Sequence, residues 1–239
     1  MCGRYTLSVT DLGEVVTLLD AILDPAAAAL HRPRYNIAPT DAAIVALLDP
    51  VAPAVGAVLR PRLVPGVWGL RRGQHLVLNV RSETAATRFA PAYQRRRCVV
   101  PADGFYEWTG AARDRRPLWF HAADGAALLM AGLFDEQDGL EGGALGAPPA
   151  FAVLTTAAIE PVAAIHDRMP VLLSREGARR WLATAPRVLL SDAVPLAARP
   201  VSPRVNATAH DDPACLEPAG PDGGDPRGSS RTGTQLGLF

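Results

Sequence analysis

Apolar residues recur along the chain in short blocks, and the spacing within each block predicts its secondary structure. Compact apolar runs bounded by turn residues predict β-strands over 43–48, 63–68, 76–80, 118–121, 127–133, 151–155 and 171–173. Helical spacing predicts a helix that Thr10 caps and that runs to about Leu23, with an apolar face of Leu12, Val15, Leu19 and Ile22. A second helix is predicted after Ser174 as its cap, with inward-facing Ala178, Trp181 and Leu182.

This order of elements predicts an α+β fold, with a mainly antiparallel or barrel-like sheet flanked by helices. We expect one domain over residues 1–210, with a surface loop at the Gly/Pro-rich residues 137–150. Residues 211–234 are predicted to be a flexible, disordered linker, because 218–234 contain no large apolar residue. The chain then ends on a separate apolar peptide, residues 235–239.

Composition supports a folded protein and excludes several classes. The 239 residues are 49% hydrophobic, and the first 20 already carry Arg4, Asp11, Glu14 and Asp20, so we expect neither a signal peptide nor a membrane span. Three widely spaced cysteines and five scattered histidines indicate no disulfide framework, metal or organic cofactor. We therefore expect a cytoplasmic protein in a reducing compartment, and a monomer.

The charge count conceals an unusual feature. The 24 basic residues balance 24 acidic ones, and all 24 are arginine, so the only primary amine on the mature chain is its N-terminus. Residues 58–120 hold 12 arginines against Glu83, Asp103, Glu107 and Asp114, a local balance of +8. Composition leaves two interpretations open, which are a stripe that faces a polyanion and a set of scattered solvated arginines.

Four polar residues stand out from apolar or turn-rich surroundings: Cys2, Asn79, Glu107 and His166. Taken singly, each is compatible with an ordinary structural role. Their flanking words MCGRYTL, RYNIAPT, WGL, LNVRSET, CVVPADGFYEW and IHDRMPVLL together resemble the SOS response-associated peptidase (SRAP) family of abasic-site processing proteins. The resemblance runs from Met1 to about residue 205 and implies an SRAP-like domain.

The resemblance implies a protein that crosslinks itself to abasic sites in single-stranded DNA. Removal of Met1 would expose the α-amine and thiol of Cys2, and an α-amine is roughly 10–15% unprotonated at neutral pH, against about 0.04% for a lysine amine. That amine would attack the aldehyde of the opened sugar to give an imine, and the thiol would close a thiazolidine ring. Two alternatives remain, a thiol peptidase with Cys2 as nucleophile and His166 as base, and a non-covalent DNA-binding module.

The resemblance also assigns roles to other residues. Asn79 would orient the reacting groups by hydrogen bonding, Glu107 would shuttle protons, and His166 would assist opening of the sugar ring. Arg81 and Arg168 would contact phosphates, with Arg4 a weaker candidate. Trp68 would offer a stacking face, with burial in the core as the alternative.

Two further contacts complete this expectation. Pro39 would wedge against bases beside the lesion, and Thr155 or Thr156 would donate a hydrogen bond near the active site. Trp108 and Trp181 are assigned to the core.

The terminal peptide QLGLF resembles the short motif by which bacterial DNA-polymerising and repair proteins dock on the sliding clamp. Gln235, Leu236, Leu238 and Phe239 would fill adjoining pockets of the clamp, although a chance apolar terminus is the alternative. A tether of this kind would raise the local concentration of the domain at replication forks in the bacterial nucleoid.

Overall fold

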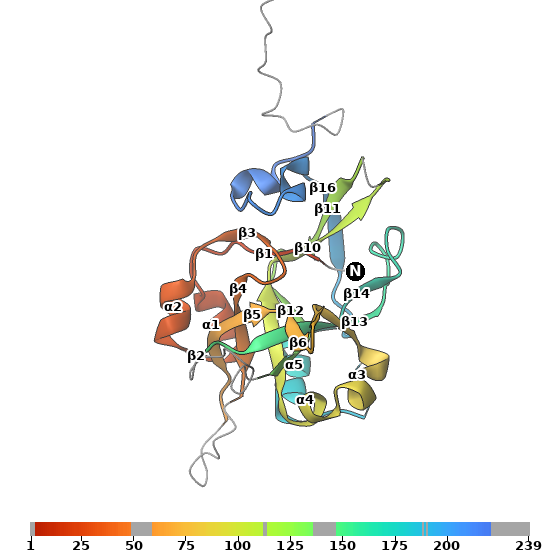
Figure 1. Cartoon of the computed structure of the whole chain (residues 1–239). Coiled ribbons are helices and arrows are strands. Elements are labelled where there is room, and N and C mark those ends of the chain that lie inside the picture. Colours follow the sequence, from red (N-terminus) through yellow and green to blue (C-terminus); the bar gives the residue numbers. More distant parts are fainter. Residues whose placement is uncertain are drawn as a thin grey trace, which may run out of the picture.

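Two mostly antiparallel sheets carry the chain, and Figure 1 shows the smaller one above the larger. The computed structural model describes residues 3–48, 59–111, 114–135, 147–187, 189 and 191–220. The smaller sheet has five strands, in the order β16 (Leu196–Pro200), β11 (Arg116–Ala122), β10 (Gly104–Thr109), β1 (Tyr5–Leu7) and β3 (Arg34–Ile37). The expected α+β fold with a mainly antiparallel sheet is confirmed.

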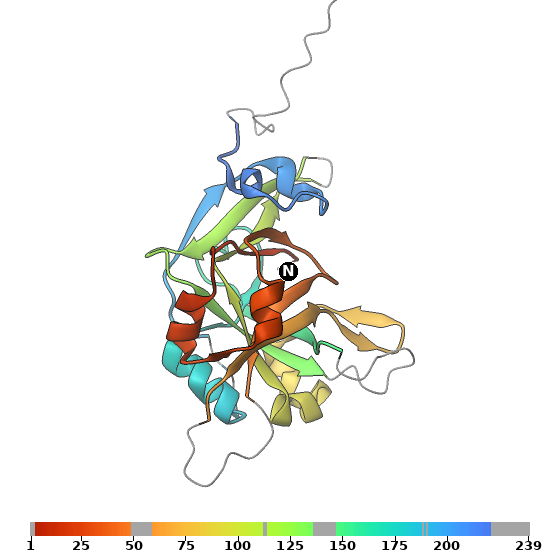
Figure 2. The ribbon, with the colours of Figure 1, turned by 90° about the vertical axis from the view of Figure 1, so that its left-hand side faces the viewer.

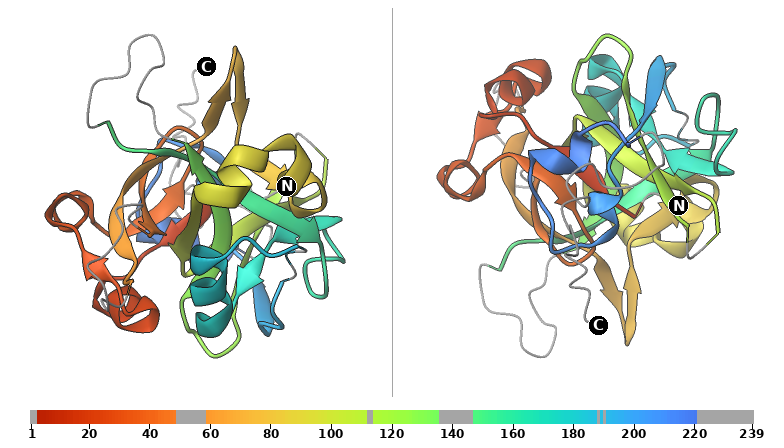
Figure 3. Two further views of the ribbon diagram at one scale, coloured as in Figure 1. Left: turned by 90° about the horizontal axis from the view of Figure 1, so that it is seen from below. Right: turned by 90° about the horizontal axis from the view of Figure 1, so that it is seen from above.

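The larger sheet closes on itself. Its path runs through β14 (Arg168–Pro170), β13 (Ala150–Ala157), β12 (Leu128–Asp135), β9 (Arg97–Ala102), β4 (Ala42–Leu47), β5 (Arg62–Trp68) and β2 (Ile22–Leu23). An additional parallel pairing of β13 with β5 joins five of these strands into a ring, so the core is barrel-like (Figure 3). β15 (Leu172–Leu173) pairs with β12, and β8 (Asn79–Arg81) pairs with β13.

A two-stranded hairpin and five short helices complete the described chain. The hairpin consists of β6 (Leu70–Arg72) and β7 (His75–Val77). The helices are α1 (Gly13–Leu19), α2 (Pro25–Leu30), α3 (Ser82–Arg88), α4 (Ala90–Arg95) and α5 (Arg175–Ala183), with 3-10 turns η1 (Pro203–Asn206) and η2 (Pro213–Leu216).

The two predicted helices have different outcomes. Helix α5 begins after Ser174, whose Oγ accepts from Gly177 N at 3.0 Å, and its inward face is as predicted. The first helix is shorter than predicted, because Asp20 takes a left-handed conformation and ends it. Thr10 does not cap it, and Ile22 lies in β2 with 47% of its surface exposed.

The predicted strand over 76–80 is two strands. The carbonyl of Leu78 accepts hydrogen bonds from Trp68 Nε1 and Val153 N, both at 3.0 Å, and the chain changes partner there. β7 pairs with β6 before this residue, and β8 pairs with β13 after it. Most of the surface loop predicted over 137–150 lies outside the described residues, and Ala150 belongs to β13.

The described chain packs beyond the expected domain boundary at residue 210. Asp211 accepts hydrogen bonds from the backbone N–H groups of Tyr35 and Asn36 at 2.6 and 2.9 Å, and its carboxylate also pairs with Arg34. Cys215 is fully buried in a small cluster beside Tyr106. Residues 211–217 therefore belong to the folded part, because their carboxylate and thiol groups are used internally.

We predict that Asp211→Ala destabilises the protein by about 2–4 kcal/mol, because buried N–H donors and a guanidinium lose their acceptor. Urea unfolding measures this free energy. Arg32→Ala is the control, because Arg32 also contacts Asp211 but is 62% exposed, and we expect it to cost less than about 1 kcal/mol. Equal effects of the two substitutions would show that the C-terminal segment does not depend on the buried contacts.

Candidate functional site

Strand pairing to β13 brings together four of the residues singled out in the sequence. Parallel β8 sets Asn79 opposite Val153 and Arg81 opposite Thr155. Antiparallel β14 sets Pro170 opposite the same Thr155, and Arg168 opposite Ala157. Residues that are far apart in the sequence thus share one end of β13, close to where β14 is drawn in Figure 1.

Glu107 reaches the site from the smaller sheet. β10 lies beside β1 with Tyr5 opposite Phe105, and Tyr106 N donates to Arg4 O at 3.0 Å. Continuing this antiparallel register sets Gly3 opposite Glu107. The start of the described chain therefore runs along Glu107, while Cys2 itself lies outside the described residues.

Glu107 is 4% exposed, and this burial raises the pKa of its carboxyl. The nearby His166 works in the opposite direction, because a positive imidazolium stabilises the carboxylate. Two groups that can exchange protons thus influence each other, although Glu107 lies in β10 and His166 lies in the loop before β14. Such an environment is typical of a site that moves protons.

The ring of His166 has two alternative partners on one nitrogen. Its Nδ1 lies 2.9 Å from the backbone N of Arg168 and 2.9 Å from Asp167 Oδ1. Accepting from Arg168 N requires a bare Nδ1, whereas pairing with the carboxylate of Asp167 requires a proton there. The two contacts require different hydrogen placements on Nδ1, so they do not form at the same time.

Arg168, predicted to contact phosphate, lies in an internal ion pair. Its two terminal nitrogens donate to the two carboxylate oxygens of Glu83 at 2.6 and 2.8 Å, and one also donates to Thr155 O at 2.6 Å. The hydrogen bond from Arg168 lowers the pKa of Glu83 from 4.5 to about 2. Only 10% of the Arg168 side chain is exposed, so a phosphate would have to replace Glu83 to reach it.

Arg81, the other predicted phosphate contact, is exposed. It has no acidic ion-pair partner among the residues that the structure describes. Thr155 is buried, and its carbonyl is taken by Arg168, while Thr156 is half-buried at the end of β13. Of the two arginines predicted to contact phosphate, only Arg81 is exposed.

The stacking face expected at Trp68 is a wrong prediction, and burial in the core is the outcome. Trp68 is 0% exposed, and its ring packs edge-on against Tyr5 at a centroid distance of 5.2 Å. Its Nε1 donates to Leu78 O, directly before Asn79. Trp68 thus supports the site from beneath, and cannot stack on a base.

Trp108 is half-buried, although the sequence assigned it to the core with Trp181, which is 1% exposed. Its Nε1 donates to Asn206 Oδ1 at 2.6 Å, and the guanidiniums of Arg4 and Arg115 lie 6.0 and 5.5 Å from its ring. Sequence reasoning missed this cluster, because only the fold brings Arg115 and Asn206 to the strand that carries Trp108.

Two weaker candidates for DNA contact, Arg4 and Pro39, differ in how far their side chains are engaged inside the protein. Arg4 is partly buried and donates to Asn36 Oδ1 at 3.0 Å and to Val205 O at 2.9 Å, so it ties β1 to the C-terminal segment. Pro39 is half-buried in the turn between β3 and β4. The structure thus gives Arg4 an internal role and leaves part of the Pro39 ring accessible.

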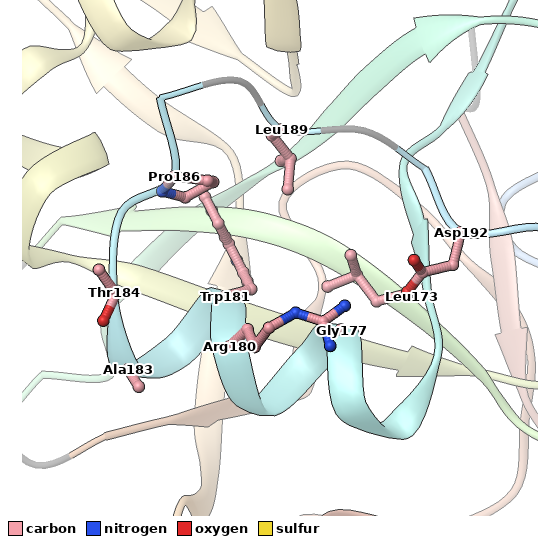
Figure 4. Close-up of a pocket in the computed structure, with 9 residues that line it drawn as sticks. All are labelled: Leu173, Gly177, Arg180, Trp181, Ala183, Thr184, Pro186, Leu189 and Asp192. Atoms are coloured by element: carbon pink, nitrogen blue, oxygen red, sulfur yellow. The ribbon is translucent and has the colours of Figure 1, made fainter.

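Among the described residues, neither a metal-binding group nor the cavity beside α5 coincides with these residues. Within the described ranges, no three His, Cys, Asp or Glu side chains are placed to hold a metal ion, and no helix is long and apolar enough to cross a membrane. A cavity of about 580 Å³ lies between α5 and the segment that follows it (Figure 4). None of the site residues predicted from the sequence lines it.

The chain is similar to known proteins in sequence and in fold. A family model described as "SOS response associated peptidase (SRAP)" matches residues 1–208. The chain is 32% identical over 197 residues to abasic site processing protein YedK of Escherichia coli K12, which covers 76% of this chain and 79% of that protein. It is 29% identical to abasic site processing protein YoqW of Bacillus subtilis 168, over 91% and 99% of the two chains. A crystal structure from Bacteroides thetaiotaomicron matches 91% of this chain and 100% of its own, with a TM-score of 0.72 at 18% identity, which shows a shared fold.

The Glu83–Arg168 pair predicts a pH-dependent contribution to stability. Because the pKa of Glu83 is lowered to about 2 in the folded state, its contribution is present above about pH 4.5 and is lost as the pH falls towards 2. We expect Glu83→Gln to cost about 1–2 kcal/mol near neutral pH, a value reduced because Glu83 is half exposed. Urea unfolding at a series of pH values should show the variant and the wild type converging in acid.

Glu176→Gln is the matched control, since Glu176 occupies the first turn of α5 as Glu83 occupies that of α3. Both substitutions remove the same favourable interaction with a helix N-terminus. Two results would rule out the ion pair as the source of the stability lost in Glu83→Gln. One is an equal loss in Glu176→Gln, and the other is a loss in Glu83→Gln that persists unchanged in acid.

Proposed function

Because the chain belongs to the SOS response associated peptidase (SRAP) family, we propose that it processes abasic sites in single-stranded DNA by a covalent crosslink through Cys2. The similarity to proteins named for abasic-site processing supports the substrate. One structural observation carries the chemistry, which is that the register of β1 leads the start of the chain along Glu107. This register brings Gly3, the first described residue, beside a carboxyl group that can move protons.

The identity of the nucleophile follows from which amines and thiols the chain offers. The sequence has no lysine, so an imine can form only at the N-terminus once Met1 has been removed by hydrolysis. The other two cysteines, Cys98 and Cys215, are buried, and burial raises the pKa of both thiols. Cys2 combines the available amine with a thiol two carbon atoms away.

The proposed reaction forms two bonds to one carbon atom and releases one water molecule. The Cys2 amine adds to the aldehyde carbon of the opened sugar, and the resulting carbinolamine loses its hydroxyl as water to give an imine. The Cys2 sulfur then adds to the imine carbon, and the thiol proton ends on the nitrogen. The product is a thiazolidine, with no oxidant or reductant consumed.

The residues around the start of the chain have distinct roles in these steps. Glu107, whose pKa burial raises, keeps its proton to a higher pH than an exposed carboxyl and can protonate the departing hydroxyl. His166 exchanges a proton with the sugar oxygen as the ring opens. Asn79 orients the sugar and the amine by hydrogen bonds, and Trp68 holds the chain beneath it.

Binding of the DNA strand is assigned to the accessible groups of the site. Arg81 contacts a phosphate beside the lesion, and Pro39 lies against a neighbouring base. Arg168 reaches a phosphate only by exchanging Glu83 for it, and otherwise it holds α3 against β14. Thr156 is better placed than the buried Thr155 to donate to the bound sugar.

We expect the protein with Cys2 at its N-terminus to form a heat-stable adduct with a single-stranded oligonucleotide that carries one abasic site. Denaturing gels and intact mass measure it, with a mass equal to the sum of the partners minus one water. Cys2→Ser should keep the amine and give only an imine, which borohydride traps and heat destroys. Glu107→Gln should slow adduct formation by about 10²-fold because a proton carrier is lost.

The control adds one alanine between Met1 and Cys2, which keeps the thiol but separates it from the free amine. This variant should form no heat-stable adduct. A heat-stable adduct in the control, or none in the wild type with a confirmed Cys2 terminus, would reject the thiazolidine mechanism. Peptide cleavage that depends on Cys2 in the absence of any adduct would favour the thiol peptidase.

The second part of the proposal concerns the terminal peptide, which lies outside the described residues. Residues 235–239 follow a segment of linker composition and resemble a clamp-binding motif, so we assign them to the sliding clamp. Docking there would keep the domain at replication forks in the cytoplasm. The effective-concentration effect would then favour capture of lesions as they are exposed.

We expect a peptide of residues 230–239 to bind a bacterial sliding clamp and to compete with the full-length protein. Replacement of Leu238 and Phe239 by alanine should weaken binding by at least about tenfold, because apolar anchors dominate short-peptide docking. Thr234→Ala, just before the motif, should change binding little. Fluorescence anisotropy measures these affinities, and a full-length protein that ignores the clamp would remove this assignment.

A further inference from the structure

The arginine-rich stretch of the sequence divides into two groups in the fold. Several of its arginines form ion pairs: Arg60 with Asp20, Arg62 with Asp24, Arg96 with Asp135 and Arg116 with Asp114. Arg97 is buried and donates to backbone carbonyls. The other described arginines of the stretch have no acidic ion-pair partner among the described residues: Arg71, Arg72, Arg81, Arg88, Arg95 and Arg115. Only part of the stretch therefore carries charge that is available to an anionic ligand.

Two of the available arginines lie on the β6–β7 hairpin. Arg71 is opposite Leu76 and Arg72 is opposite His75, and the turn between them contains Gly73 with a φ of +60°. All residues from 71 to 76 are exposed. Figures 2 and 3 show the hairpin as an arm that extends from the body.

The base of the arm is fixed by several contacts. Gly69, with a φ of +134°, donates to Phe151 O at 2.7 Å, and the Leu76 side chain covers the side of Gly69 where a Cβ would lie. The guanidinium of Arg72 lies 4.8 Å from the ring of Phe89, between α3 and α4. The base of the arm is thus held against the body, and the guanidinium of Arg72 has a defined position.

The arm leads directly into the candidate site. β7 is followed, after Leu78, by β8 with Asn79 and Arg81. At about 3.3 Å per residue, the chain from His75 to Arg81 spans at most roughly 20 Å, which is about six stacked nucleotides at ~3.4 Å each. A strand bound at Arg81 can therefore continue along the arm.

We propose that the β6–β7 hairpin binds the phosphates of single-stranded DNA several nucleotides from the lesion, through Arg71 and Arg72. This inference rests on the proposed function, since it assigns a longer path to the same strand. The arm lacks any acidic residue between 70 and 77, so an anionic backbone meets no opposing charge there. The exposed His75 and Leu76 add ring and apolar surfaces against which bases can pack.

The test measures non-covalent binding of lesion-free single strands, which keeps it independent of the crosslink. Arg71→Gln with Arg72→Gln should weaken binding of an oligonucleotide of about fifteen nucleotides by roughly three- to tenfold. The slope of log affinity against log salt should fall by about 1.4, or 0.7 for each lost phosphate contact. Binding of an oligonucleotide of about four nucleotides should change little.

Two further variants separate charge from structure. Arg71→Lys with Arg72→Lys keeps both charges and should retain most of the affinity and slope. Arg175→Gln with Arg180→Gln removes two exposed charges from α5, away from the arm (Figure 2), and should leave binding unchanged.

The outcomes distinguish failure of this inference from failure of the proposed function. The role of the arm would be overturned if the glutamine variant of the arm bound single strands with wild-type affinity. It would also be overturned if the lysine variant or the α5 variant lost as much affinity as the glutamine variant. Each result would hold even where the wild type still crosslinks. A wild type that neither binds single strands nor crosslinks would overturn both.

Discussion

The pairing of β13 on both of its edges is the constraint on which the site depends. Along one edge, β13 pairs antiparallel first with β12 and then with β14. Along the other edge, it pairs parallel first with β5 and then with β8. The pairing with β5 closes the barrel, and the pairing with β8 sets Arg81 beside Thr155. A slip of one residue in β8 would bury Arg81 and expose Val80, which is 3% exposed, so the core fixes the register.

The same edge shows how the fold uses two arginines differently. Burying the guanidinium of Arg168 has a cost in solvation, and the bidentate carboxylate of Glu83 with the carbonyl of Thr155 offsets it. This arrangement anchors α3 directly after β8, and leaves Arg81 as the outward cation. One of these two neighbouring cations is thus held inside the fold, and the other is exposed to solvent.

The sequence predicted the elements whose signals are local. Helix α5 has its cap, Ser174, and its apolar face within ten residues, and the central barrel strands are continuous apolar runs. The strands β1, β3, β9 and β10 were missed, because they are short or carry polar residues that only distant partners satisfy. Asp211 is the clearest case, since its segment reads as a linker until Tyr35, Asn36 and Arg34 supply its donors.

Sequence motifs single out residues without reporting their exposure. Asn79, Glu107 and His166 stand out by the words around them, and the fold brings Glu107 of β10 near His166, which precedes β14. Trp68 shares the resemblance, but its exposure depends on Tyr5 and Leu78, which no local pattern reports. A motif predicts where chemistry lies more securely than which side of the backbone faces the ligand.

A reactive group on the first residue of a mature chain would ordinarily be poorly positioned, because chain ends fray. Here β1 has only three residues, Tyr5–Leu7, but it is paired on both sides, by β10 and by β3, and all three are buried. The sheet thereby fixes the direction of the chain at Gly3. Rigid elements generally position functional groups more precisely than loops do. The free end that the proposed thiazolidine chemistry requires is compatible with a fixed direction of the chain, because Gly3 precedes a strand that lies inside a sheet.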